Sequence, residues 1–267
     1  MRYWNGYVWT QHLARPARFA PSPFARPAAK QPAARPAPGV PGLGIAVIGF
    51  GVAVGLSLLI LWLLSRAGNP GGVAARLGLS EIGLWVGMIG AVVVASKRNG
   101  TGKLSVDFGW TVRKVDIGIG VLGAIAARSM AYLASIPLLP VYEQLQRQPQ
   151  VGLSPSRITG ATGVVFGLVV CVGAPIVEEL FFRGLIQTRL VGLLGAGWGI
   201  AVTSVLFGAA HLIGWQNVAS LLAAAIIAAS GSVLGFLRYR TGRLGTSTIA
   251  HSVFNGMVFA LLLATNT

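Results

Sequence analysis

The feature that most constrains this sequence is a series of long apolar segments separated by short, basic connections. Each segment approaches the ~20 residues that an α-helix needs to cross the hydrocarbon of a bilayer. An open strand would leave its amide groups without partners in lipid, so we expect these segments to be helical. They lie near residues 43–64, 80–96, 116–139, 159–177, 198–213, 218–237 and 245–264. The sequence therefore predicts an all-α membrane protein, a polytopic bundle of about seven (six to eight) transmembrane helices.

The composition supports a membrane location. Only 10% of the 267 residues are charged, against about 25% in ordinary soluble domains, and the mean hydropathy is +0.71. A formal charge of +15 can indicate a nucleic-acid partner, but here the basic residues fall between the apolar segments. Because no aromatic and basic binding module occurs in the sequence, we expect the lipid bilayer, and no nucleic acid, as its partner.

The basic residues also predict how the chain is oriented. Cytoplasmic connections of membrane proteins carry an excess of Lys and Arg. The second and sixth connections hold such residues: Lys97, Arg98, Lys103, Arg113 and Lys114, then Arg238, Arg240 and Arg243. Seven spans place both connections on the same side as the basic N-terminal tail. The prediction is a multi-pass protein of the cell membrane with a cytoplasmic N-terminus and an external C-terminus.

Three regions follow one another along the chain. Residues 1–42 form a basic, Pro- and Ala-rich tail without the apolar core of a signal peptide, so the first apolar segment is expected to be an uncleaved anchor. Residues 3–10 contain Asn-Gly between aromatic residues, a type I′ hairpin signal, and resemble the end of a short Trp-rich module. Residues 43–157 hold the N-terminal transmembrane helices, and residues 158–265 hold the polar residues described next.

An acidic pair, Glu178 and Glu179, lies in the fourth apolar region. A charge at the centre of a bilayer costs roughly 2.5–3.5 kcal/mol on insertion scales, so such a pair needs a reason. On a helix Glu179 faces Arg183 four residues later, whereas Glu178 is rotated from Glu179 by about 100°. We therefore expect Glu179 and Arg183 to neutralise each other and Glu178 to remain available. A desolvated carboxylate with high proton affinity is suited to activate water as a general base.

The length of the fourth helix decides whether Glu178 can meet His211. If this helix ended near residue 177, Glu178 would lie near the inner surface and His211 near the outer end of the fifth segment. We expect the helix to continue through about Leu190, because residues 158–195 contain no strong breaker after Pro175. A shifted or re-entrant fifth helix is the alternative. Pro175 should bend the helix and free a backbone carbonyl one turn earlier.

Two histidines lie in the later apolar segments. His211 follows Phe207 by four residues, so the two rings can pack along one helix face. His251 precedes Asn255 by four residues, which directs both polar groups to one side. A single His in a membrane helix is often a satisfied interhelical hydrogen bond, and a buried ion-pair network would explain the acids. The combination of two His, an aligned Asn and an unpaired Glu favours a catalytic cluster.

Three motifs, in this order, resemble those of the CAAX-protease and bacteriocin-processing family, the type II CAAX endopeptidase-like intramembrane metalloproteases. They are Glu-Glu-x-x-x-Arg at 178–183, Phe-x-x-x-His at 207–211 and His-x-x-x-Asn at 251–255. The resemblance covers about residues 160–260 and makes 158–265 the expected catalytic core. It implies a peptidase whose helices face a cavity open to the cytosol, cleaving near the C-terminus of a membrane-associated peptide or protein.

The resemblance implies catalytic roles for four side chains. Glu178 would activate the attacking water, assisted by His211, while His251 and Asn255 would hold the water or stabilise the oxyanion. Glu178, His211 and His251 could also form an open zinc site. The sequence contains no His-Glu-x-x-His motif, however, and a metal-free Glu and His mechanism uses the same residues. Both possibilities remain open at this point.

Further residues are expected to support the site. By resemblance, Glu179 and Arg183 would position the helix, and Phe207 would pack beside the catalytic histidine. Gly231 and Gly235 match the spacing of small residues at helix contacts, but in a chain with 37 glycines this spacing is near chance.

Two other functions fit the same residues. A non-catalytic membrane scaffold, or a sequestering protein of the bacteriocin-immunity type, would keep the polar cluster for structure or binding. A small transporter would use Glu178 and Arg183 as an ion site, but the hydropathy shows no repeated half and no paired broken segments. The substitution Glu178→Gln distinguishes catalysis from scaffolding, since only catalysis requires the carboxylate.

Overall fold

The computed structural model of the chain describes residues 2–4, 9–13, 41–141, 160–212 and 218–264. The chain divides into two compact units, Met1–Ala34 and Arg35–Thr267. The first contains two short strands and the second contains the apolar helices.

The first unit contains an antiparallel pair of strands. β1 (Arg2–Trp4) pairs with β2 (Trp9–Leu13), with Arg2 opposite Leu13 and Trp4 opposite Trp9. The hairpin expected at residues 3–10 is therefore present as a strand pair. The predicted Asn-Gly turn lies outside the described residues.

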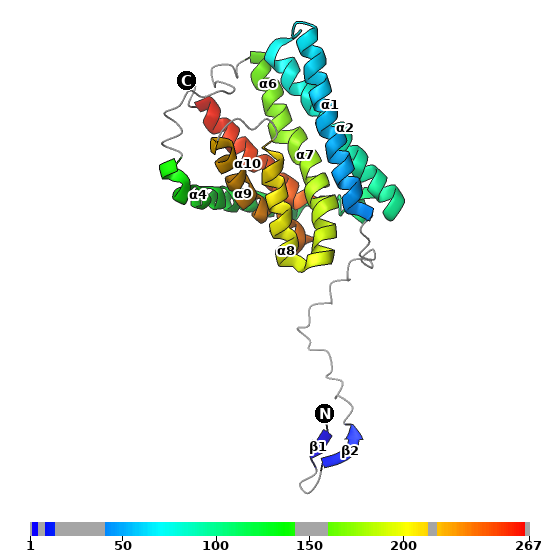
Figure 1. The fold of residues 1–267 in the computed structure, drawn as a ribbon. Helices are drawn as coiled ribbons and strands as arrows, with labels where there is room; N and C mark the ends of the chain where they lie inside the picture. The colour runs from blue at the N-terminus through cyan, green and yellow to red at the C-terminus, as the bar shows by residue number, and fades with distance from the viewer. Residues whose placement is uncertain (1, 5–8, 14–40, 142–159, 213–217, 265–267) are drawn as a thin grey trace. The chain divides into compact units, whose positions relative to one another are not determined.

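The second unit is a bundle of helices (Figure 1). In chain order they are α1 (Pro41–Arg66), α2 (Gly72–Asn99), α3 (Leu104–Asp107), α4 (Lys114–Ser135), the 3-10 turn η1 (Ile136–Leu138), α6 (Gly160–Leu168), the π-helix η3 (Val169–Gly173), α7 (Ala174–Glu178), the π-helix η4 (Glu179–Ile186), α8 (Gln187–Ala210), α9 (Val218–Thr241) and α10 (Leu244–Ala264). Within the described residues, six helices are long and apolar enough to cross a membrane. The predicted polytopic α-helical bundle is confirmed.

The longest of these six stretches, Gly160–Ala210, consists of two limbs. The helix runs on from α6 into α8 until Gly195, whose φ of 77° and ψ of 171° are readily adopted only by glycine. The chain reverses there (Figure 1), and a Cβ at Gly199 would lie 2.5 Å from the backbone nitrogen of Val191. The predicted continuation of the fourth helix through about Leu190 is confirmed, and the two limbs correspond to the fourth and fifth predicted segments.

The second transmembrane helix begins earlier than predicted. The apolar segment was expected from about residue 80, whereas α2 begins at Gly72. Arg76 lowers the hydropathy of the first two turns but does not interrupt the helix. Gly71, with a φ of 76°, ends the short connection after α1. As a result Glu81 lies nine residues inside α2, about 14 Å along its axis at 1.5 Å per residue.

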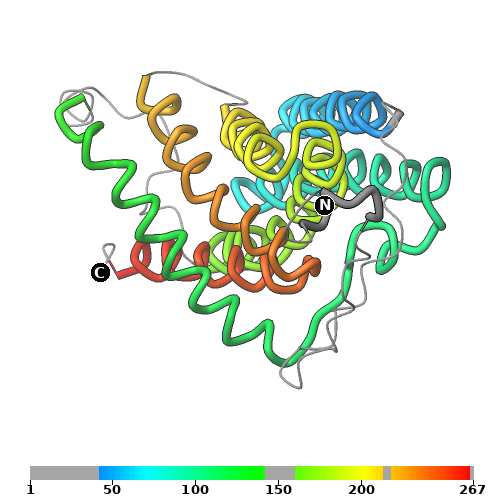
Figure 2. Tube along the Cα trace, turned by 90° about the horizontal axis from the view of Figure 1, so that it is seen from below, coloured from blue at the N-terminus to red at the C-terminus, as the bar shows by residue number. Residues whose placement is uncertain are grey.

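Small residues let the helices approach closely. A Cβ at Gly87 of α2 would collide with the backbone and the Cβ of Ala53 in α1, and one at Gly83 would meet the Ser57 nitrogen at 2.8 Å. Other closely packed pairs include α8 with α9, α4 with α9, and α4 with α10. Figure 2 shows α1 and α2 on one side of the long helix and α4, α9 and α10 on the other.

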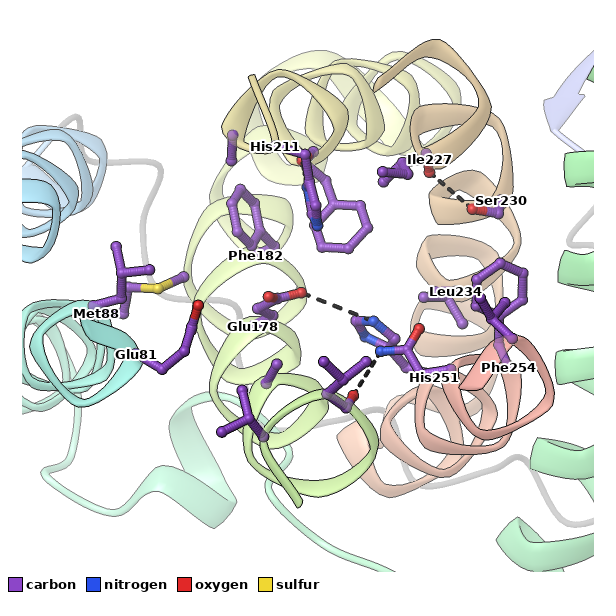
Figure 3. A pocket seen from close by; sticks show the side chains of 18 of the residues that line it. Glu81, Met88, Glu178, Phe182, His211, Ile227, Ser230, Leu234, His251 and Phe254 are labelled. Atoms are coloured by element: carbon purple, nitrogen blue, oxygen red, sulfur yellow. Dashed lines mark hydrogen bonds and ion pairs between the residues drawn. The ribbon is translucent and has the colours of Figure 1, made fainter. Parts of the chain in front are cut away.

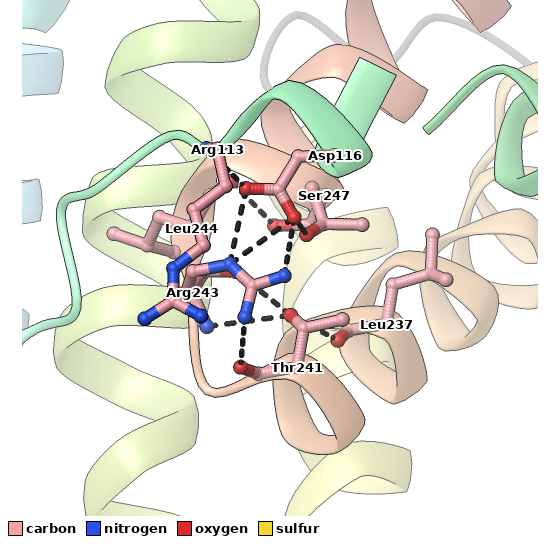
Figure 4. A network of polar contacts seen from close by, with 8 residues as sticks. Arg113, Asp116, Leu237, Thr241, Arg243, Leu244 and Ser247 are labelled. Carbon is pink, nitrogen blue, oxygen red and sulfur yellow. Dashed lines mark hydrogen bonds and ion pairs between the residues drawn. The ribbon is translucent and has the colours of Figure 1, made fainter. Parts of the chain in front are cut away.

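A buried carboxylate joins the beginnings of α4 and α10 (Figure 4). Asp116 is fully buried and accepts a hydrogen bond of 2.7 Å from the Arg113 nitrogen, which caps α4. The Arg243 guanidinium forms an ion pair with the same carboxylate, and the Thr246 hydroxyl donates to it at 2.6 Å. These contacts fix the first turn of α10, two turns before His251.

Candidate active site

The acidic pair lies at a junction between α- and π-helix. Glu178 is the last residue of α7 and Glu179 the first residue of η4, near the middle of the long helical limb. Their side chains diverge as the helical rotation predicts: Glu179 is fully buried, whereas Glu178 lines a cavity. π-Helical turns inside α-helices occur frequently at functional sites.

Glu179 and Arg183 form the predicted ion pair in the protein interior. Their side chains are both fully buried, and Arg183 Nη1 lies 3.0 Å from Glu179 Oε1. Arg183 Nη2 donates a hydrogen bond of 3.2 Å to the carbonyl of Gly231 in α9. Its guanidinium lies 4.0 Å from the centre of the Phe207 ring in α8, a cation–π contact. Arg183 therefore joins three helical segments through one buried cation.

Glu179 also holds His251, a contact that the sequence did not predict. His251 Nδ1 lies 3.2 Å from Glu179 Oε1. A carboxylate oxygen accepts in this bond, so Nδ1 is the donor and Nε2 of the neutral ring is left with its lone pair. His251 Nε2 lies 3.8 Å from Glu178 Oε2 (Figure 3), a separation that a bridging water can close.

His211 ends α8 and faces the same cavity. Its Nδ1 lies 2.8 Å from the carbonyl oxygen of Phe207 in the preceding turn, which can only accept, so Nδ1 donates. Nε2 of neutral His211 is therefore free to accept a proton or a hydrogen bond. The Phe207 ring lies edge-to-face between the two histidines, 5.0 Å from His211 and 5.7 Å from His251 between ring centres. The predicted packing of Phe207 on His211 is present.

Asn255 connects α10 to the first π-helix. Its Nδ2 donates a hydrogen bond of 2.8 Å to the carbonyl of Val170. In the π-helix η3, the Ala174 N–H donates to the carbonyl of Val169, five residues earlier. By the same spacing, the carbonyl of Val170 would accept from residue 175. That residue is Pro175, which has no N–H to donate. Pro175 thus frees a carbonyl, as predicted, and Asn255 satisfies it. One of the two Nδ2 hydrogens remains for other partners.

The cavity between the helices has a volume of about 750 Å³. Glu178, His211, His251 and Asn255 all line it, together with mostly apolar side chains (Figure 3). The wall is formed by α1, the middle of α2, the first half of the long limb, the end of α8, the middle of α9 and the later turns of α10, with one residue of α4. Leu61 extends it from the acidic pair toward the end of the bundle where α1 connects to α2.

The site does not present a complete set of metal ligands. Among the described residues, no group of three or more His, Cys, Asp or Glu side chains is arranged to hold a metal ion. His211 directs its Nδ1 to a carbonyl of its own helix, which leaves Nε2 as the ring nitrogen that could bind a metal, and Glu178 and His251 approach each other to 3.8 Å. The zinc site remains a prediction, and the mechanism below uses no metal.

Three contributing features were not identified in the sequence. Glu81 of α2 lines the cavity beside Glu178. The carbonyls of Gly231 and Gly235 accept hydrogen bonds from buried Arg183 and Gln187, so this glycine spacing has a definite role. A Cβ at Gly231 would lie 3.1 Å from Arg183 Nη2, so the absence of a side chain keeps space for the guanidinium.

Comparison with known proteins gives one family. Residues 160–257 match the model of the type II CAAX prenyl endopeptidase Rce1-like family, which confirms the resemblance noted in the sequence. The matched segment contains all three motifs and covers a little over a third of the chain. No curated protein and no solved structure matches the chain.

Proposed function

Because residues 160–257 carry a domain of the Rce1-like type II CAAX prenyl endopeptidase family, we propose that this protein is an intramembrane endopeptidase. It hydrolyses a peptide bond of a membrane-associated protein or peptide with water activated by Glu and His side chains. The observation that carries this proposal is the meeting of Glu178, His211 and His251 at one cavity, although they come from three different helices. The family match supports the reaction class, and the geometry supports the roles that we propose below.

The attacking water binds between Glu178 and His251. Glu178 Oε2 takes a proton as the water oxygen attacks the carbonyl carbon of the scissile bond. The proton then passes to the leaving amide nitrogen, the C–N bond breaks, and an acid and an amine are released. General-base assistance of this kind contributes typically 10²–10⁴-fold to a rate. The two hydrogens of the water are directed to Glu178 and His251, so His211 Nε2, with its lone pair free, assists by relaying the proton from Glu178 to the leaving nitrogen.

The remaining motif residues hold these groups in place. Glu179 fixes the ring of His251, and Arg183 fixes Glu179. Asn255 keeps one Nδ2 hydrogen for the oxyanion that develops on the carbonyl oxygen, where a preorganised donor contributes most. Buried, paired positioning groups of this kind keep the reacting atoms in a productive geometry.

The proposal is tested with purified protein and a library of membrane peptides. Wild type is compared with Glu178→Gln and His211→Ala, and with Asp107→Asn as an acid-to-amide control outside the membrane-spanning helices. We expect cleavage by wild type and the control, and a loss of roughly 10²-fold or more in the two site variants. Cleavage that resists a metal chelator supports the metal-free mechanism. Equal cleavage by wild type and Glu178→Gln would refute the assignment, and no cleavage by any form would favour the scaffold.

A further inference from the structure

Glu81 is a cavity-lining carboxylate that the proposed mechanism does not use. It is half-buried and lies in the membrane-spanning part of α2. In Figure 3, Glu178 lies between Glu81 of α2 and His251 of α10. Within the described part of the chain, the Glu81 carboxylate has neither a hydrogen-bond nor an ion-pair partner. A charge within a membrane is costly when it is unpaired, so this carboxylate requires a compensating interaction.

The cavity around Glu81 has an anionic and apolar character. Among its lining residues there is no Lys or Arg, while Glu81 and Glu178 both contribute carboxylates and interact electrostatically. The fully buried cation Arg183 already pairs with Glu179. The rest of the wall is mainly aliphatic and aromatic, including Phe166, Leu58 and Phe259. Such a wall favours an apolar ligand that carries a positive charge at one point.

We propose that Glu81 is a specificity-determining subsite that binds the cationic side chain of an Arg or Lys within an otherwise apolar peptide substrate. This proposal rests on the proposed endopeptidase function and adds the class of substrate. The guanidinium or ammonium group neutralises Glu81, and the flanking apolar residues occupy the wall. The scissile bond then lies at Glu178, and the two carboxylates have separate roles: Glu81 binds and Glu178 reacts.

The test uses matched peptides of about 20 apolar residues that differ only in one Arg or its neutral isostere citrulline. Binding is measured on the Glu178→Gln variant and cleavage on wild type, with each repeated in the presence of Glu81→Gln. We expect about a tenfold preference for Arg, seen mainly in Kd and KM, that Glu81→Gln removes and Glu81→Asp partly retains. The Asp107→Asn variant should keep the preference.

The outcomes separate this proposal from the proposed function. The subsite is overturned if folded Glu81→Gln protein still prefers Arg peptides. It is also overturned if the proteins that carry Glu81 show no preference for Arg. Equal effects of Glu81→Gln on the Arg and citrulline peptides would show a proton-transfer or structural role instead, and would also overturn it. If the Glu178→Gln protein prefers Arg peptides but wild type cleaves none, the subsite stands and the endopeptidase fails.

Discussion

The buried ion pair between Glu179 and Arg183 allows the energetic basis of the site to be measured. Replacing Arg183 with Met removes the 3.0 Å ion pair, the hydrogen bond to Gly231 and the contact with the Phe207 ring. It also leaves the Glu179 charge buried without its cation. Loss of one partner of a fully buried pair typically costs 3–5 kcal/mol. In a membrane the unfolded helices also find polar partners, so we expect about 3 kcal/mol.

The complementary change makes the pairwise energy visible. Glu179→Gln leaves Arg183 without its carboxylate, and we expect a cost of similar size. The double variant leaves no unpaired charge, so its cost should fall below the sum of the single costs by about 2 kcal/mol. The free energy of unfolding is measured in mixed detergent micelles by the fluorescence of the seven Trp residues. Activity of each variant is followed in parallel, because Glu179 also holds His251.

A second ion pair in the same chain provides the control. Asp116 and Arg243 form an ion pair in which the Arg243 side chain is 17% exposed, in contrast to the fully buried Arg183. Solvent screens such a pair, so its coupling energy should be clearly smaller. Two results would contradict this reasoning. One is a free energy of unfolding of both single variants, at Glu179 and at Arg183, within about 1 kcal/mol of wild type. The other is a double variant whose cost equals the sum of the two single costs.

Two further predictions concern packing and pH. Because a Cβ at Gly87 would collide with Ala53, Gly87→Ala should destabilise the protein by about 1–3 kcal/mol in the same unfolding assay. Gly90 has open space around it, so Gly90→Ala should leave the stability unchanged. Equal effects of the two substitutions would contradict the close contact between α1 and α2. Burial would raise the pKa of Asp107, but hydrogen bonds, including one from Ser96, outweigh it and hold that pKa below its usual value. The ionised Asp107 carboxylate therefore contributes to stability above pH ~4, and this contribution is lost as the pH falls through the lowered pKa. When the free energy of unfolding is measured against pH in the acid range, Asp107→Asn should remove this loss.

Helical rotation alone separated the two neighbouring glutamates correctly. Residues one position apart point about 100° away from each other, and this local rule placed Glu179 toward Arg183 and Glu178 toward the cavity. The contact of Glu179 with His251 could not be predicted in this way, because it joins residues 72 positions apart. Such a contact depends on how α10 packs on the long limb, and one sequence does not contain that information.

Helix register and helix limits explain the other differences. Pro175 predicts a freed carbonyl, but an α-helix would place it four residues earlier, at Cys171, whereas the π-helix η3 places it at Val170. No sequence pattern indicates a π-turn. Glu81 was overlooked because the apolar segment was expected to begin near residue 80, which would put this carboxylate at the membrane surface. The start of α2 at Gly72 puts it deeper instead.

The two neighbouring glutamates have different roles: Glu179 is structural and Glu178 is the proposed reactive group. Glu179 is completely enclosed, and its charge is balanced by Arg183, so it can hold His251 in one orientation. Glu178, one residue earlier, faces the cavity, and its polar contact within the described residues is the 3.8 Å approach to His251 Nε2, which leaves its oxygens accessible to water. A base with strong fixed partners would be a poor proton acceptor, whereas an isolated histidine would be poorly oriented. Placing the fixed and the free carboxylate side by side on one helix satisfies both requirements.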